Sequence, residues 1–98
     1  ADVNKRIPYG WSSLHLAVHY GNVGVVRSLL QHGANANDED ELGRTALHLV
    51  SSIGITLTLL EHGADVDARD REGARPLETV SRIGYHNVAQ LLSKRSTR

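Results

Sequence analysis

The chain of 98 residues repeats itself, and this repetition constrains its fold more than any other feature. Residues 10–16 (GWSSLHL) align with residues 43–49 (GRTALHL) at a spacing of 33, and with residues 73–79 (GARPLET) a further 30 residues along. A second block, residues 29–37 (LLQHGANAN), recurs as residues 59–67 (LLEHGADVD). A period near 33 with two blocks in each copy indicates stacked supersecondary units, none of which can bury its apolar face alone.

Both blocks resemble the ankyrin-repeat family. Its pattern is a glycine turn, then Thr-Pro-Leu-His opening a helix, then a second helix ending in Leu-Leu, then Gly-Ala-Asp-Val-Asn. The first motif reads SSLH at residues 12–15, TALH at residues 45–48 and RPLE at residues 75–78. The resemblance covers essentially the whole chain. It implies an all-α solenoid of stacked helix-turn-helix units joined by β-hairpin-like loops.

The same alignment divides a single domain into parts with different roles. These parts are a hairpin remnant of a preceding repeat at 1–8, a repeat at 9–41, a shortened repeat at 42–71, and a C-terminal capping repeat with a basic tail at 72–98. Ser93 replaces the second leucine of the Leu-Leu pair, and a polar last repeat keeps a solenoid soluble. The first repeat has no such cap, so we expect its apolar face, around Leu16 and Val23, to lie partly open.

Periodic apolar positions and cap residues predict six helices in three antiparallel pairs. We expect them near residues 14–20, 24–31, 47–52, 55–61, 77–82 and 86–94. The second repeat is shorter than the first, and aligning Gly54 with Gly21 puts the loss at the turn between its helices. We therefore predict a short or distorted helix over 55–61. A tolerated loop deletion and an altered functional surface both stay open as interpretations of this loss.

The composition excludes several classes of function. Lysine and arginine number 11 and so do the acids, and this balance argues against a basic nucleic-acid-binding surface. The lack of cysteine excludes disulfides and thiolate zinc sites. No apolar run approaches the roughly 18 residues of a membrane helix. We expect no cofactor, no nucleic-acid or membrane partner, and an intracellular protein of the cytoplasm or nucleus, with an organelle not excluded.

Six histidines invite a metal or catalytic interpretation, but their positions favour structural roles. The resemblance implies that His15 and His48 make hydrogen bonds within and between repeats. One repeat apart, at about 10 Å, they are too distant to share a zinc ion. In the third repeat the corresponding pair is Arg75 and Glu78, which can interact with each other. No phosphate loop, paired-carboxylate or Ser-His-Asp pattern occurs, so we predict no enzyme.

Recognition of another protein is the function that remains. The resemblance implies contacts from the hairpin tips and the first helices, at positions that the repeat leaves free. The residues selected on this basis are Tyr9, Trp11, His19, Tyr20, Leu42, Arg44, Ile53, Arg71, Arg82 and Ile83. Trp11 is expected to be an exposed hot spot. Tyr20, Ile53 and Ile83 each precede a glycine, so we expect them to form one row. In the alternative interpretation, these side chains only cover neighbouring parts of the stack.

Three functions follow from these observations. The first is a non-enzymatic adaptor or scaffold that binds an extended or amphipathic helical protein segment in a concave groove. The second is an assembly module that packs through its uncapped N-terminal face as a homo- or hetero-oligomer. The third, a regulator of a kinase or a transcription factor, rests on family analogy alone.

Overall fold

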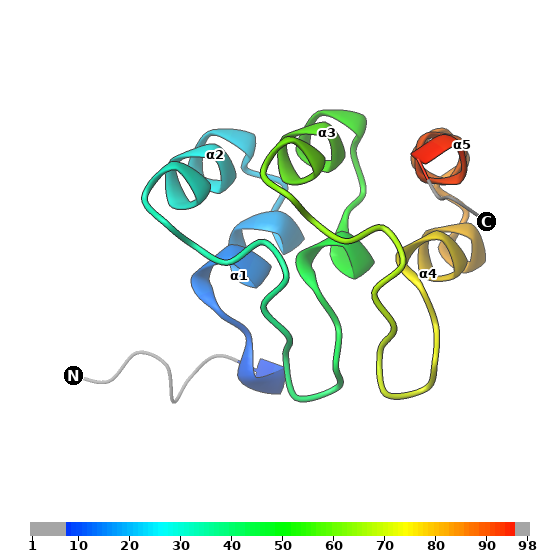
Figure 1. Ribbon diagram of the computed structural model, residues 1–98. Helices are drawn as coiled ribbons and strands as arrows, with labels where there is room; N and C mark the ends of the chain where they lie inside the picture. Colours follow the sequence, from blue (N-terminus) through cyan, green and yellow to red (C-terminus); the bar gives the residue numbers. More distant parts are fainter. Residues whose placement is uncertain (1–7, 96–98) are drawn as a thin grey trace.

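The computed structural model describes residues 8–95, and every regular element within that range is helical. The elements are η2 (Pro8–Gly10), α1 (Ser13–His19), α2 (Val23–Gln31), η3 (Ala46–Leu49), α3 (Ile53–Glu61), α4 (Pro76–Ile83) and α5 (His86–Arg95). Three helix pairs stack side by side in chain order, and long loops project from one side of the stack (Figure 1). The described part is elongated, with extents of 43 × 27 × 20 Å. The predicted all-α repeat fold is confirmed.

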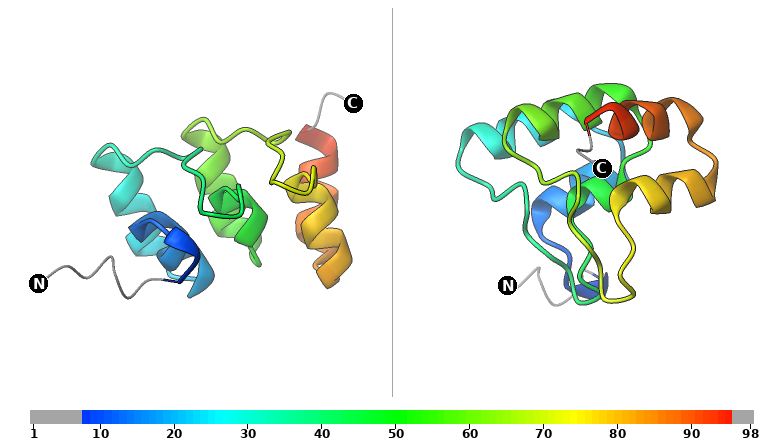
Figure 2. Two further views of the ribbon diagram at one scale, coloured as in Figure 1. Left: turned by 90° about the horizontal axis from the view of Figure 1, so that it is seen from below. Right: turned by 45° about the vertical axis from the view of Figure 1, so that its right-hand side comes forward.

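The helices fall into two layers, and this arrangement positions the candidate site. Helices α2, α3 and α5 form an outer row, whereas α1, η3 and α4 form an inner row next to the loops (Figure 1). The loops converge beside one another below the inner row (Figure 2, right). We call the surface formed by these hairpin loops and the inner row the inner face.

Local sequence explains where the helices begin. Ser12 accepts a hydrogen bond from the backbone N–H of His15, and the ring Nδ1 of His15 accepts one from the backbone N–H of Ser12. Asn22 and Ser52 cap α2 and α3 in the same way, each accepting an N–H three residues on. Such caps satisfy donors that the helix itself leaves unpaired and stabilise it by about 1 kcal/mol each.

The core runs through the stack from one repeat to the next. Leu14 and Leu47, which occupy equivalent positions of the first helices, are buried, as are Val26 of α2 and Leu59 of α3. Val88 and Leu92 of α5 complete this core at the far end. The middle repeat has neighbours on both sides, and Leu47, Ile55 and Leu59 are its largest fully buried side chains. Burial is therefore spread along the stack rather than concentrated on one centre.

The predicted distortion of the helix over 55–61 is wrong. Helix α3 has 9 residues, as α2 has, whereas η3 has only 4 residues against 7 in α1. The residues that the second repeat lacks are missing from its first helix, which is reduced to one 3-10 turn. Gly54 consequently lies inside α3 at the position of Gly24, and it does not correspond to the left-handed Gly21 (φ 73°).

The second helix of this repeat is intact and closely packed. Helix α3 lies between α2 and α5 and contacts both. Its β-branched Ile55, Thr56 and Thr58, which are mediocre helix formers, are almost completely buried there. The two threonine hydroxyls are satisfied within the helix, because they donate to the carbonyl oxygens of Ser52 and Gly54. Shortening α3 would remove this burial from two interfaces at once.

The motif histidines join neighbouring repeats. The Nε2 of His15 lies 2.8 Å from the carbonyl oxygen of Arg44, and the Nε2 of His48 lies 2.8 Å from that of Ala74. In both rings Nδ1 accepts a backbone N–H, so Nε2 carries the proton and donates it. Burial lowers the pKa of His48 below its ordinary value, although the hydrogen bond to Ala74 acts in the opposite direction.

Candidate functional site

Backbone hydrogen bonds fix the spacing of the hairpins on the inner face. Within one hairpin, the N–H of Asp40 donates to the carbonyl of Arg44. Between hairpins, the N–H of Glu41 donates to the carbonyl of Tyr9, and the N–H of Arg71 donates to that of Leu42. Each tip is therefore tied to the one before it, and the side chains that the tips carry form one continuous surface.

Trp11 and Asp40 form the centre of this surface. The indole Nε1 of Trp11 donates to Oδ2 of Asp40 over 2.9 Å, and the guanidinium Nε of Arg44 reaches the same oxygen over 2.9 Å. Oδ1 accepts the backbone N–H groups of Leu42 and Arg44. Burial by itself would raise the pKa of the Asp40 carboxyl, but the hydrogen bonds from Arg44 and Leu42 hold this pKa below its ordinary value.

The expectation that Trp11 is an exposed hot spot needs correction. Its side chain is buried, with 8% of the residue exposed. The tryptophan belongs to the packing between η2, α1 and the hairpin of Asp40, because its polar edge is hydrogen-bonded to Asp40 and its ring contacts Tyr9 and His19. For this residue the alternative interpretation, that the side chain covers a neighbouring part of the stack, describes the structure.

An aromatic ladder runs from η2 to the end of α1. The ring centroids are 5.6 Å apart between Tyr9 and Trp11, 4.9 Å between Trp11 and His19, and 5.2 Å between His19 and Tyr20. The guanidinium of Arg44 lies over the ring of Tyr9 at 5.0 Å. Tyr9 and Tyr20, at the two ends, are 51% and 74% exposed. The ladder thus joins two exposed tyrosines through the buried Trp11 and the exposed His19.

A pocket of about 200 Å³ lies next to this ladder, between the second and third hairpins. It is lined by Leu42, Arg44, Asp70, Arg71, Glu72, Thr79 and Arg82. Four of these, Leu42 and the three arginines, were selected from the sequence. Arg44 belongs to both features, because it lines the pocket and also covers Tyr9.

The three residues expected to form a row do not share one helix layer. Tyr20 and Ile83 do occupy equivalent positions, each at the end of an inner helix before a left-handed glycine. Ile53, however, is the first residue of α3 and therefore belongs to the outer row. The cause is the shortened η3, which shifts the alignment of the second repeat. Ile83 is 58% exposed and Ile53 is 37% exposed.

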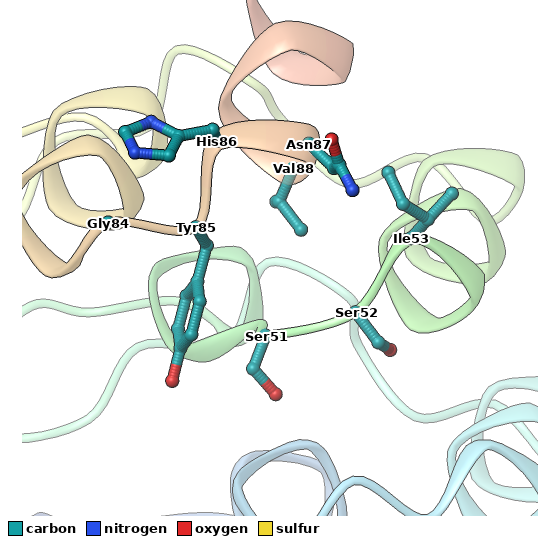
Figure 3. Close-up of a pocket in the computed structure, with 8 residues that line it drawn as sticks. All are labelled: Ser51, Ser52, Ile53, Gly84, Tyr85, His86, Asn87 and Val88. Carbon is teal, nitrogen blue, oxygen red and sulfur yellow. The ribbon is translucent and has the colours of Figure 1, made fainter.

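Ile53 instead lines a separate open cavity of about 470 Å³ between the second and third repeats. Its other lining residues are Ser51, Ser52, Gly84, Tyr85, His86, Asn87 and Val88 (Figure 3). The side chain of Tyr85 extends past Ser51 at the edge of this space (Figure 3). The cavity lies beside the turn that follows η3, at Ser51 and Ser52. The shortness of η3 therefore helps to leave this space open.

Sequence reasoning missed Asp40 and Thr79, two polar residues of the inner face. A signal for the first was present, because Asp40 and Asp70 both stand three residues before a turn glycine. Each uses Oδ1 to accept two backbone N–H groups of its own turn. In residues 8–95 no group of three potential metal ligands comes together. No helix within the same range has the length and apolarity needed to cross a bilayer.

Comparison with known proteins agrees with this geometry. The family model described as ankyrin repeats (three copies) matches residues 1–70. The chain belongs to the ankyrin-repeat family. Ankyrin repeats are protein–protein interaction modules, and the family is generally non-catalytic, so the recognition of proteins predicted from the sequence stands at this general level.

Several curated relatives each match part of the chain. The inhibitor of Bruton tyrosine kinase from Homo sapiens is 44% identical over 41 residues, which are 42% of this chain and 3% of the relative. Protein phosphatase 1 regulatory subunit 27 from Homo sapiens is 42% identical over 45 residues, 46% of this chain and 29% of the relative. The E3 ubiquitin-protein ligase hecd-1 from Caenorhabditis elegans is 51% identical over 47 residues, 48% of this chain and 2% of the relative. The matches span less than a third of each relative.

Proposed function

We propose that this ankyrin-repeat unit is a non-enzymatic adaptor or scaffold that binds an extended or amphipathic helical segment of another protein on its concave inner face. The observation that carries the proposal is the exposure of Tyr9 and Tyr20 at the two ends of a ladder that is anchored on the buried Trp11. The ladder holds both rings in place before any partner arrives, which lowers the conformational entropy lost on binding.

The surroundings of the tyrosines support the same use. Leu42 is 44% exposed beside the arginine-lined pocket, and Ile83 is 58% exposed at the end of α4. Tyrosine and arginine are enriched among the residues that dominate interface energies. Apolar and cationic groups on one rigid face suit an amphipathic protein segment, which presents both apolar and acidic side chains.

Selection of random peptides displayed on phage tests this proposal with the chain as it exists. Peptides that bind the wild-type chain should bind the Tyr20→Ala variant at least about tenfold more weakly. The matched control is Arg27→Ala, a substitution of an exposed residue on the outer helix α2. Peptides that bind Tyr20→Ala as well as the wild type, but fail on Arg27→Ala, would move the site to the outer row and contradict the proposal.

A second candidate, assembly through the first repeat, has its own observation. Val25 and Leu29 of α2 occupy the positions that Ile55 and Leu59 occupy in α3. The α3 pair is 1% and 0% exposed because α2 covers it, whereas Val25 is 44% exposed. A groove of about 430 Å³ lies on this face, and Tyr20 lines it together with Leu16, Ala17, Val25 and Leu29 among others. The face is thus a stacking surface with no described repeat on it.

Sedimentation equilibrium over a range of concentrations tests assembly. Self-association that is reduced by Val25→Glu and unchanged by Arg27→Glu would support it, because only the first substitution charges the stacking surface. A monomer at all concentrations would contradict homo-oligomerisation.

Regulation of a kinase or a phosphatase is a narrower form of the adaptor proposal, supported by the names of two relatives, an inhibitor of a tyrosine kinase and a phosphatase regulatory subunit. A transcription factor as the regulated partner rests on family analogy.

A further inference from the structure

Three arginines converge on the pocket of the inner face from different elements. Arg44 follows the turn of the second hairpin, Arg71 lies in the third hairpin, and Arg82 lies in the last turn of α4. Thr79, three residues before Arg82 on the same helix, adds a hydroxyl to the wall. The stack thus gathers three cationic side chains around about 200 Å³ in a chain whose formal net charge is zero.

These guanidinium groups keep hydrogen-bonding capacity to spare. Among residues 8–95, neither Arg71 nor Arg82 forms an ion pair with a carboxylate. Arg44 donates through Nε to Asp40, while its Nη2 is buried and has no partner among the same residues. Guanidinium groups recognise carboxylates and phosphates through paired N–H donors. The free donors of Arg71 and Arg82 are therefore available to an anionic group from outside.

The acidic residues of the pocket set the charge of its ligand. Asp70 is occupied by its own turn, because its Oδ1 accepts the backbone N–H groups of Glu72 and Ala74. Glu72 also lines the pocket, and Asp40 already pairs with Arg44, so three carboxylates offset the formal charge of the three arginines. A carboxylate with one negative charge therefore meets less repulsion from these acids than a phosphate with nearly two, and it can still pair with the free donors of Arg71 and Arg82.

We propose that this pocket binds one aspartate or glutamate side chain of the partner segment, held between Arg71 and Arg82 beside the apolar contact with Tyr9 and Tyr20. The inference rests on the proposed function, since it names the chemistry of the segment that the inner face takes up. The acidic residue provides register: it fixes which part of the segment meets the tyrosines.

The stack also sets the spacing expected within the segment. Neighbouring helices pack about 8–10 Å apart, and an extended chain advances about 3.3 Å per residue. One repeat therefore corresponds to about three residues of an extended ligand. Because Arg44 touches Tyr9 and Arg82 lies on the third repeat, the acidic residue should stand about three to six residues from the apolar residue that meets the tyrosines.

The experiment uses peptides selected from a random phage-displayed library on the wild-type chain. Binders should share an aspartate or glutamate at this spacing from an apolar residue. A synthetic binder, its variant with the acid replaced by the corresponding amide, and a phosphoserine variant are then titrated against wild-type, Arg82→Gln, Arg71→Gln and the outer-helix control Arg27→Gln. We expect the amide to weaken binding to the wild type by about tenfold or more, as for a charge-assisted hydrogen bond.

The paired substitutions make the result specific to the pocket. Arg82→Gln should weaken binding of the acidic peptide but not binding of its amide variant. The substitution in the protein and the amide in the peptide together should therefore reduce the affinity no more than either change alone. Arg27→Gln should leave both affinities unchanged, and thermal melts should show that each variant is folded. Tighter binding of the phosphoserine peptide would overturn the carboxylate assignment. Equal affinity of acid and amide, with Tyr20→Ala still disruptive, would overturn the pocket proposal and leave the proposed function standing. Insensitivity to Tyr20→Ala as well would contradict both.

Discussion

The indole N–H of Trp11 donates to the carboxylate of Asp40 over 2.9 Å, although the two residues are 29 positions apart in the chain. This bond joins the start of the first repeat to the hairpin that precedes the second. Both side chains are buried, so each satisfies a polar group of the other away from water. Tyr9 and Arg44 contact this pair directly, and Tyr20 is linked to it through His19.

Substitution of Trp11 should destabilise the fold. Trp11→Ala removes a buried indole and should lower the free energy of unfolding by about 3–5 kcal/mol. Trp11→Phe keeps most of the apolar volume but leaves one Asp40 hydrogen bond unmade, at a cost of about 1–3 kcal/mol. Urea unfolding monitored by circular dichroism measures both values. An unchanged midpoint for Trp11→Ala would show that the side chain is exposed, as the sequence had suggested.

The middle repeat should be sensitive to truncation of its core. Leu47 is fully buried on η3, where α1 and α4 pack against the short turn from both sides. Leu47→Ala should cost about 2–5 kcal/mol, a large part of the stability of a domain this small. Leu42→Ala is the control, since Leu42 is 44% exposed on the inner face and should cost little. Equal melting of the two variants would contradict the burial of Leu47.

Two glycines with similar backbone angles should respond differently to alanine. Gly33 and Gly43 have φ values of 97° and 78°, so alanine is strained at both. A Cβ on Gly43 would also lie 2.9 Å from the backbone nitrogen of Arg71, whereas a Cβ on Gly33 meets nothing within 4 Å. Gly43→Ala should therefore lower the free energy of unfolding by about 1 kcal/mol or more beyond Gly33→Ala. Equal losses would mean that the two hairpins are not in close contact.

Stability should fall as the pH drops below about 6.5, the ordinary pKa of histidine, because of His48. Burial depresses the pKa of His48 in the folded state, so the unfolded chain binds the proton more readily. The stabilising contribution is complete above the unfolded pKa and is lost as the pH falls through the folded one. Asp40, whose pKa is below 3.8, does not titrate in this window.

The measurement for His48 is the urea midpoint at several pH values between neutral and mildly acidic. The wild type should lose more stability over this range than His48→Gln, which cannot titrate, even though the variant is less stable at neutral pH. Parallel pH dependence of the two proteins would show that His48 is not the group responsible.

The sequence determined the repeat, the helix caps and the core of this protein, because each depends on residues close in the chain or on the period itself. Ser12 and Asn22 cap helices whose first turns they adjoin. Leu14 and Leu47 share a repeat position and are both buried. Arg71 and Arg82 stand at positions that the repeat leaves free, and both line the inner-face pocket.

Only the tertiary structure decided where the shortened repeat lost its residues and which aromatic residue is buried. The sequence allows the loss in either helix of the second repeat. The structure places the loss in η3, whereas α3 keeps nine residues between α2 and α5, where Ile55, Thr56 and Thr58 are buried. The burial of Trp11 likewise depends on Asp40, which reaches the indole only when neighbouring hairpins pair in space. Contacts between residues a repeat apart have no local signal, and they decide which of several locally acceptable arrangements has the lowest free energy.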